Sequence, residues 1–224
     1  MAAGGGFNFN DGAQIIRTAN QADNVFSAAT LDWGSKFTNL DGASRSDRIR
    51  YDSPTFAGFG VSASALSSGA GDVALRYAGK FGGIAVKAAA SYLNTSASSA
   101  TVDSQWVVSA AAEHDSGINV RGQYGKADKT LNTSDDTKAW AVGLGYDANL
   151  TSMGATSFAI GYHVSENLAG NDQEATQTDF GVVQHIKDAG TELYLGVALL
   201  EFDDATATNY EDATSIIAGT RIKF

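Results

Sequence analysis

The stretch Trp140-Ala141-Val142-Gly143-Leu144-Gly145-Tyr146 decides the fold, because large apolar residues alternate along it with alanine and glycine. Successive side chains of a β-strand point to opposite faces of the sheet. One face of such a strand is therefore apolar, and the other carries no side chain larger than a methyl group. A face of small residues could not pack as the second apolar layer of a soluble sandwich, but it suits a surface turned to water or to a lumen.

The same period of two recurs many times from about residue 47 to the end of the chain. Apolar or aromatic residues occupy one parity and small or polar residues the other, which predicts an all-β protein. We expect eleven strands, at residues 47–53, 58–66, 72–78, 83–93, 104–114, 118–127, 138–147, 156–165, 176–187, 191–202 and 213–224.

The connections between these strands alternate in length, which is an independent signal. Short links are expected at 54–57, 79–82, 115–117 and 188–190, and longer polar links at 94–103, 127–137, 166–175 and 203–212; the link at 147–155 is a longer exception. This alternation is typical of an antiparallel up-and-down transmembrane β-barrel whose short turns are periplasmic. The sequence therefore predicts such a barrel, with about 11–12 strands in this chain.

The composition excludes other classes of protein. The chain has no Cys, which excludes a disulfide framework or a cysteine-based metal site. No run of about 18 apolar residues occurs, so a transmembrane helix is excluded as well. The mean hydropathy of -0.13 is uninformative, because barrel strands face lipid only at every second position. The formal net charge of -10 argues against nucleic acid as a partner.

Residues 1–46 form a head segment that precedes the barrel strands of residues 47–224. If the barrel closes on itself, residues 5–10 are the best candidate for a twelfth strand, since bacterial single-chain barrels use even strand numbers. Residues 11–46 show no sustained period, and a connection that long is usually functional or disordered. We expect this segment to fold into the pore as a long inward loop.

Several motifs resemble a known family. They are residues 37–42 (FTNLDG), 47–59 (DRIRYDSPTFAGF), 4–9 (GGGFNF) and 72–83 (DVALRYAGKFGG), together with the alternating C-terminal strand that ends in Phe224. These motifs resemble the general diffusion porins of Gram-negative bacteria, particularly the alphaproteobacterial kind. The resemblance covers nearly the whole chain as the C-terminal part of a sixteen-strand pattern, without roughly the first five strands. The chain is then a fragment, a natural short barrel or half of a two-chain barrel.

The resemblance implies an outer-membrane pore, trimeric, for passive diffusion of small hydrophilic solutes. Its partners would be membrane lipid and lipopolysaccharide, and no cofactor is implied. The family places the region of Phe7-Asn8-Phe9 in the constriction loop, which competes with its reading as a strand. The alternative function is an incomplete or plugged barrel that acts as an interaction component by pairing with another chain. A soluble β-sandwich binding module is a third reading, which the small polar faces disfavour.

A porin selects solutes by pore geometry and electric field, so charged residues that line the lumen are the candidate site. Parity places the basic candidates on the luminal face: Arg48, Arg50, Arg76, Lys87 and Arg121. The acidic counterpart is expected on the inward loop, with Asp23, Asp32 and Asp41 as candidates. The alternative reading of each basic residue is a solvated charge outside the narrowest part.

Catalysis and metal binding find little support in the sequence. His114, His163 and His185 stand isolated along the chain, without a nucleophile elbow or a zinc-ligand spacing. The acidic pairs at 135–136, 203–204 and 211–212 lack the spaced ligand set of a calcium site. We therefore predict no catalytic residue and no metal site. Tyr and Trp residues near the strand ends on the outward parity indicate an interfacial aromatic girdle.

Overall fold

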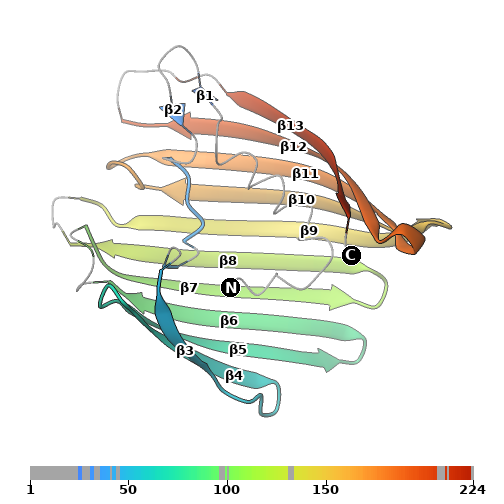
Figure 1. Ribbon diagram of the computed structural model, residues 1–224. Coiled ribbons are helices and arrows are strands. Elements are labelled where there is room, and N and C mark those ends of the chain that lie inside the picture. The colour runs from blue at the N-terminus through green and yellow to red at the C-terminus, as the bar shows by residue number, and fades with distance from the viewer. Residues whose placement is uncertain are drawn as a thin grey trace.

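The computed structural model of the chain describes residues 25–26, 31–32, 36–40, 42–43, 46–95, 99, 101–130, 134–205, 210 and 212–222. Its main element is a curved antiparallel sheet of eleven strands, each paired with its neighbour in sequence (Figure 1). A short hairpin, β1 (Val25–Phe26) with β2 (Leu31–Asp32), precedes the sheet. Within the described residues no helix is long and apolar enough to cross a membrane.

The eleven strands of the sheet follow the chain in order from one edge to the other. They are β3 (Arg48–Asp52), β4 (Phe59–Leu66), β5 (Gly71–Phe81), β6 (Ile84–Asn94), β7 (Val102–His114), β8 (Ile118–Lys129), β9 (Thr137–Thr151), β10 (Gly154–Glu166), β11 (Glu174–Ile186), β12 (Thr191–Asp203) and β13 (Ala213–Ile222). All eleven predicted strands are present, and the predicted antiparallel up-and-down order is confirmed.

Short turns gather at one end of the sheet and most longer connections at the other (Figure 1). The prediction of a longer link at 147–155 is wrong, because β9 continues to Thr151 and β10 begins at Gly154. A register shift between Gly154 and Thr156 interrupts the alternation there, which hides the strand ends in the sequence. At another short turn Gly117 adopts φ of 90°, a left-handed conformation that side-chain-bearing residues rarely accept.

The two faces of the sheet differ as the alternation predicts. Leu144 and Leu195 point outward and are 58% and 48% exposed, whereas Gly143 and Gly196 lie on the opposite parity and are buried. Many of the outward side chains are large and apolar, and no second layer packs on them among the residues that the structure describes. This pattern fits a sheet whose outer face meets lipid, since membrane barrels are apolar outside and polar inside.

A row of aromatic side chains lies on the outer face, near the end of the sheet that carries the longer connections. Trp106 lies 5.4 Å from Tyr124 between ring centroids, and Trp140 lies 5.5 Å from Tyr162. Tyr92 is the register partner of Trp106 and extends the row to β6. The row suits the membrane–water boundary, where amphipathic aromatic rings are enriched.

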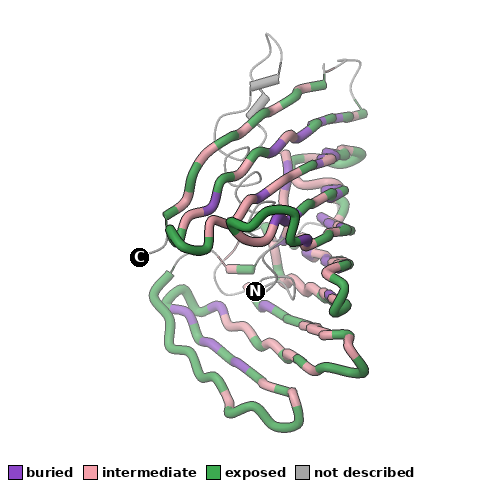
Figure 2. Tube along the Cα trace, turned by 90° about the vertical axis from the view of Figure 1, so that its right-hand side faces the viewer, coloured by how far each residue is buried: buried purple, intermediate pink, exposed green. Residues whose placement is uncertain are grey.

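The two edges of the sheet are β3 and β13, and within the described residues these strands do not pair with each other (Figures 1 and 2). Figure 2 shows the curvature that gives the sheet a concave inner face. The predicted twelfth strand at residues 5–10 falls outside the described residues, so self-closure stays a prediction.

Candidate functional site

A short piece of the head segment lies against the inner face of the sheet. We call residues 36–40 and 42–43 the luminal strap. Phe37 is 4% exposed and packs into a cluster on β11 and β12. Leu40 is 6% exposed and packs where β8 ends and β9 begins, at the end of the sheet that carries the longer connections. Ala43 packs against another apolar cluster, which includes residues of β4 and β6. The strap thus crosses the inner face from one side of the sheet to the other.

Side chains of the wall also hold the backbone of the luminal strap. Gln123 on β8 donates through Nε2 to the carbonyl of Asn39 at 2.5 Å, and Gln105 on β7 donates to the carbonyl of Leu40 at 2.7 Å. On β10 the hydroxyl of Ser165 accepts from the strap as well, from the N–H of Thr38 at 3.2 Å. Three inward polar residues on three strands therefore satisfy backbone groups of a segment that has no strand partner there.

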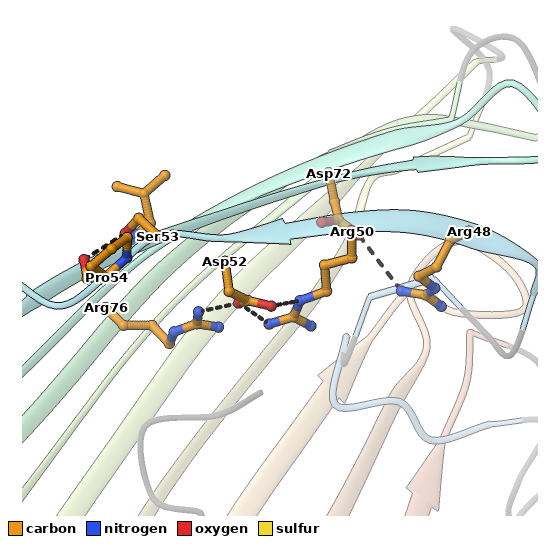
Figure 3. Close-up of polar contacts among 8 residues, drawn as sticks. Arg48, Arg50, Asp52, Ser53, Pro54, Asp72 and Arg76 are labelled. Atoms are coloured by element: carbon orange, nitrogen blue, oxygen red, sulfur yellow. Dashed lines mark hydrogen bonds and ion pairs between the residues drawn. The ribbon is translucent and has the colours of Figure 1, made fainter.

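Charged residues of β3 and β5 form a ladder on the inner face near one edge of the sheet (Figure 3). Asp52 accepts two hydrogen bonds from Arg50, at 2.9 and 2.8 Å, and a third from Arg76 at 2.8 Å. Arg48 lies 3.8 Å from Asp72, measured from Nη1 to Oδ2. We call Arg48, Arg50, Asp52, Asp72 and Arg76 the charged ladder.

The side chains of the charged ladder are only partly buried by the rest of the protein. The side chains of Arg50, Asp52 and Arg76 are 38%, 50% and 35% exposed. Ion pairs as exposed as these contribute only about 0–1 kcal/mol to stability. Their stronger physical effect is the local field, because opposed charges beside a water-filled space act on any ion that passes close to them.

The other two predicted basic residues also lie on the inward parity. Lys87 on β6 and Arg121 on β8 are both register partners of Ala111 on β7. Arg121 lies over Gly143 of the next strand, where an added Cβ would come within 2.6 Å of its Nε atom. It is also close enough to Asp179 on β11 to interact with it electrostatically. The glycine provides the space in which the guanidinium lies along the wall.

The predicted acidic residues of the loop are not placed by the structure. Asp23 and Asp41 lie outside the described residues, and Asp32 is described only by its backbone in β2. The carboxylates that pair with Arg48, Arg50 and Arg76 belong to Asp52 and Asp72, which come from the wall itself. The sequence did not predict these two partners. Asp52 lies two residues from Arg50 on the same face of β3, and Asp72 reaches Arg48 only because β3, β4 and β5 lie side by side.

The description of the histidines as isolated is wrong for His163. Its Nε2 atom lies 3.1 Å from Oδ1 of Asp179, and both side chains are almost fully buried. Gln177 donates to the same carboxylate at 2.8 Å, and Phe37 of the luminal strap packs edge-on against the imidazole, 6.4 Å between centroids. The strap therefore covers a buried polar cluster of β10 and β11.

The description of the histidines as isolated is also wrong for His185. Its Nδ1 lies 3.3 Å from Glu192 and its Nε2 lies 3.3 Å from the hydroxyl of Ser157, while Arg221 binds the same glutamate from β13. The order Ser, His, Glu is that of a hydrolase triad, but Ser157 is 1% exposed. A nucleophile must reach its substrate, so this chain of contacts serves to tie β10, β11, β12 and β13 together.

Metal ligands are not gathered in the part of the chain that the structure describes. No group of three or more His, Cys, Asp or Glu residues there is placed to hold a metal ion.

These features define a class of protein: an antiparallel up-and-down sheet with an apolar outer face, a charged inner face and a segment of chain laid across the inside. That is the wall of an outer-membrane β-barrel. The chain belongs to the Gram-negative porin family, whose model matches residues 4–205, and it is therefore an outer-membrane protein. The resemblance noted in the sequence is confirmed by this match.

Two solved structures of OmpT from Vibrio cholerae agree with the fold. Outer-membrane expressed OmpT of Vibrio cholerae is 16% identical, with a TM-score of 0.52 over 89% of this chain and 71% of that one. Its in-vitro folded trimer form is 15% identical, with a TM-score of 0.50 over 92% of this chain and 71% of that one. An anion-selective porin from Comamonas acidovorans is 19% identical, with a TM-score of 0.49 over 78% of this chain.

The chain spans 54% of the length of the Comamonas porin. No curated protein sequence matches it.

Proposed function

We propose that the chain forms the wall of a water-filled outer-membrane pore through which small hydrophilic solutes and ions diffuse passively. The observation that carries this proposal is the charged ladder, which stays half-exposed on the inner face while the outer parity presents exposed Leu144 and Leu195. Partly exposed charges on a concave inner face suit a wet interior, since unsolvated charges would need closer pairing.

The charged ladder and the luminal strap together suit selection by size and charge. Arg48, Arg50 and Arg76 would line the narrow part of the pore, with Lys87 and Arg121 further along the wall. Asp23, Asp32 and Asp41 remain our candidates for the acidic side of the constriction. We assign no cofactor and no catalytic step, and the pore works as a non-enzymatic channel in contact with membrane lipid and lipopolysaccharide.

A homotrimer is the oligomeric state that we propose. One support is that the OmpT of Vibrio cholerae, similar in fold to this chain, has a solved trimer form. Cross-linking of the folded protein in detergent, followed by sizing under non-denaturing conditions, tests this state. A species with one chain per particle would contradict it.

Conductance across a planar lipid bilayer tests the pore itself. The folded protein is expected to give stepwise ohmic currents that grow with salt concentration, because a water-filled passage carries hydrated ions. Uptake of small sugars by proteoliposomes should accompany the currents. If folded protein inserts, as judged by protease protection, and yet gives neither current nor sugar uptake, the proposed function is wrong.

A second candidate function follows from the edges β3 and β13, which do not pair with each other within the described residues. Unpaired backbone groups in hydrocarbon cost several kcal/mol each, so something must cover both edges. An incomplete barrel that pairs with another chain would meet this need, as would closure by the head segment.

Because the sequence has no Cys, introduced cysteines can separate these two arrangements. Phe7→Cys combined with Ile216→Cys would form a disulfide within one chain if the head covers β13. A disulfide between chains, seen as a dimer without reductant, would favour the two-chain barrel.

A further inference from the structure

A series of polar side chains crosses the inner face of the sheet at its short-turn end. His185 is the next-to-last residue of β11, and its two ring nitrogens each lie 3.3 Å from a partner: Nδ1 from Glu192 on β12, and Nε2 from the hydroxyl of Ser157 on β10. Arg221 on β13 donates to the same glutamate. On β9, Asp147 is the register partner of Ser157. We call these five residues the short-turn cluster.

One carboxylate oxygen of the short-turn cluster lacks a donor. Oδ1 of Asp147 is buried, and among the residues that the structure describes it has no hydrogen-bond partner. Ser157 lies directly opposite on β10 and is itself 1% exposed. Residues opposite each other on one face of an antiparallel pair have Cβ atoms about 4.5–5.5 Å apart, so the hydroxyl lies within reach of this carboxylate. The unpaired oxygen therefore has one donor beside it, which is engaged with His185.

The number of protons on His185 decides where the hydroxyl of Ser157 donates. An ionised Glu192 only accepts hydrogen bonds, so a neutral His185 carries its proton on Nδ1 and leaves Nε2 as an acceptor. The single proton of the hydroxyl then goes to Nε2, and Asp147 receives none. When His185 takes up a second proton, Nε2 donates to the hydroxyl oxygen, and the hydroxyl proton is released to donate to Asp147.

The charges around the short-turn cluster change with the same proton. Arg221 binds Glu192, whereas Asp147 interacts electrostatically with a further carboxylate, that of Glu113. A proton on His185 places a positive charge between Glu192 and Asp147. The other described charged groups near this end of the inner face are Lys80 on β5 and Lys87 on β6, which act on Glu113, and Lys187 and Asp188 in the β11–β12 turn.

We propose that proton uptake by His185 closes the short-turn cluster into one continuous series of hydrogen bonds from Asp147 to Arg221, which holds the turn ends of β9 to β13 together more firmly in acid. The side chain of His185 is 16% exposed at the short-turn end, and short turns are periplasmic, so protons of the periplasm reach it. Histidine ordinarily changes its charge between about pH 5 and 8. Because β13 is an edge of the sheet, the cluster sets how tightly the last strand is held. This inference does not depend on conduction.

An ion pair between His185 and Glu192 alone would also respond to pH. It would leave the hydrogen bonds of Asp147 unchanged, whereas the proposed rearrangement reaches Asp147 through Ser157. The carboxyl carbon of Asp147 therefore separates the two arrangements, because its NMR shift responds to a gained hydrogen bond. Aspartate carboxyls ordinarily titrate near pH 4, so a change between about pH 5 and 8 does not report their own protonation.

NMR of the full chain, folded in detergent micelles with labelled side chains, tests the proposal between about pH 5 and 8. The carboxyl carbon of Asp147 should shift in one step together with the ring nitrogens of His185. The backbone amides of residues 191–193 and 219–222, corrected for intrinsic rates, should exchange about tenfold more slowly at the acid end, since a hydrogen bond to a charged group is strong enough to change an equilibrium constant by that factor. Amides at the opposite ends of β12 and β13 should not show this change.

Two variants interrupt the series at different points. His185→Gln removes the titrating group and Ser157→Ala removes the hydroxyl, so each should abolish the step at Asp147. His114→Gln is the matched control and should keep the step, because His114 is an exposed histidine beside another short turn, where it contacts Ser116.

Loss of the step in both variants, with retention in the control, supports the proposal. A step that survives in Ser157→Ala, no step in the unmodified protein, or amide exchange that stays equally pH-dependent in His185→Gln would each overturn it. If Ser157→Ala does not fold, Asp147→Asn takes its place. The pH dependence of amide exchange at residues 219–222 should then fall, and an undiminished dependence would overturn the proposal as well.

Discussion

The carboxylate of Asp52 on β3 lies 2.8 Å from the guanidinium of Arg76 on β5, although β4 runs between the two strands. The register explains the contact. Asp52 is the partner of Ser62 and Arg76 is the partner of Gly60, so the strand between them presents only small side chains to the lumen. Arg50 shares the same carboxylate, which leaves one net positive charge on the three groups at neutral pH.

The charged ladder should set the ion preference of the pore. Replacing both Arg50 and Arg76 by Gln leaves Asp52 uncompensated, so the pore should become more cation-preferring. A change in the permeability ratio of roughly twofold to tenfold is expected, since a unit charge about 4 Å away contributes about 1 kcal/mol in water. Reversal potentials in a low-salt gradient measure it. Asp52→Asn is the opposite control and should raise the anion preference, and equal reversal potentials for all three proteins would remove the ladder from the conduction path.

A charge on the outer face should be far less tolerated than one on the inner face. Leu195→Arg places a cation against lipid and is expected to cost about 2–4 kcal/mol if the site is near the midplane. Ala85→Arg is the matched control on the inner face, where Lys80 and Glu113 are its register partners. Urea unfolding in detergent or vesicles compares the two variants. Equal loss of stability, or labelling of Gly143 and Gly196 from the lipid side, would reverse the assignment of the two faces.

The sequence predicted the strands well because membrane barrels repeat one simple physical pattern. Alternation around Leu144 and Leu195 marks a face that meets lipid, and it needs no knowledge of distant contacts. The alternation did not predict the strand ends at 147–155, because the register shift between Gly154 and Thr156 interrupts the period of two there.

The candidate site was predictable only in part. Parity assigned Arg50 and Arg76 to the inner face, but their shared partner Asp52 depends on the register of three strands. The pair of His163 with Asp179 was missed although a signal exists. In a hairpin, residues at equal distances from the two ends of the connection are partners. For the connection at 167–173 this rule pairs His163 with Gln177, which is two residues from Asp179 on the same face of the strand. The contact with Phe37 has no such signal, because that residue belongs to a segment without a strand period.

Gly161 should be needed by the buried cluster beneath the luminal strap. A Cβ at this position would lie 2.6 Å from Oδ2 of Asp179 and 2.8 Å from Nε2 of His163. Gly161→Ala is therefore expected to separate the pair and destabilise the fold by about 1–3 kcal/mol, as overpacking commonly does. Gly122→Ala, on the outward parity of β8, is the control for a glycine with space around it, because the nearest atom to its added Cβ would lie 3.7 Å away. Denaturant midpoints measure both, and a Gly161→Ala midpoint equal to that of Gly122→Ala would show that the cluster can move aside.

Asp136 should hold the connection between β8 and β9 in a pH-dependent way. Its pKa lies below the ordinary value of 3.8, chiefly because Lys126 donates to it at 2.7 Å and also because the N–H of Lys129 donates at 2.9 Å. A carboxylate with a lowered folded pKa stabilises fully above its unfolded pKa, and the contribution is lost as the pH falls through the folded pKa. The N–H of Lys129 should therefore stay protected from hydrogen exchange from neutral pH to about 4 and lose protection below that.

The Asp136→Asn variant should lose this protection of Lys129 already at neutral pH. Asp135→Asn alters the neighbouring carboxylate and serves as the control. Exchange rates are corrected for their intrinsic dependence on pH before they are compared. Protection of Lys129 that does not change in Asp136→Asn would show that the ion pair does not hold this connection.

The luminal strap should restrict the pore, and Phe37 is its strongest apolar anchor. Phe37→Ala removes a ring that is 4% exposed and packs with Leu200 and Phe202, and this loss is expected to weaken the packing of the strap on the wall by about 3 kcal/mol. Because the strap has no strand partners there, we expect it to leave the wall rather than unfold the sheet. Single-channel conductance should rise, and the N–H of Thr38 should lose protection as its bond to Ser165 opens. Phe56→Ala is the matched control, since Phe56 is 84% exposed at a short turn. An unchanged conductance together with exposed Thr38 would mean that the strap lies on the wall without narrowing the passage.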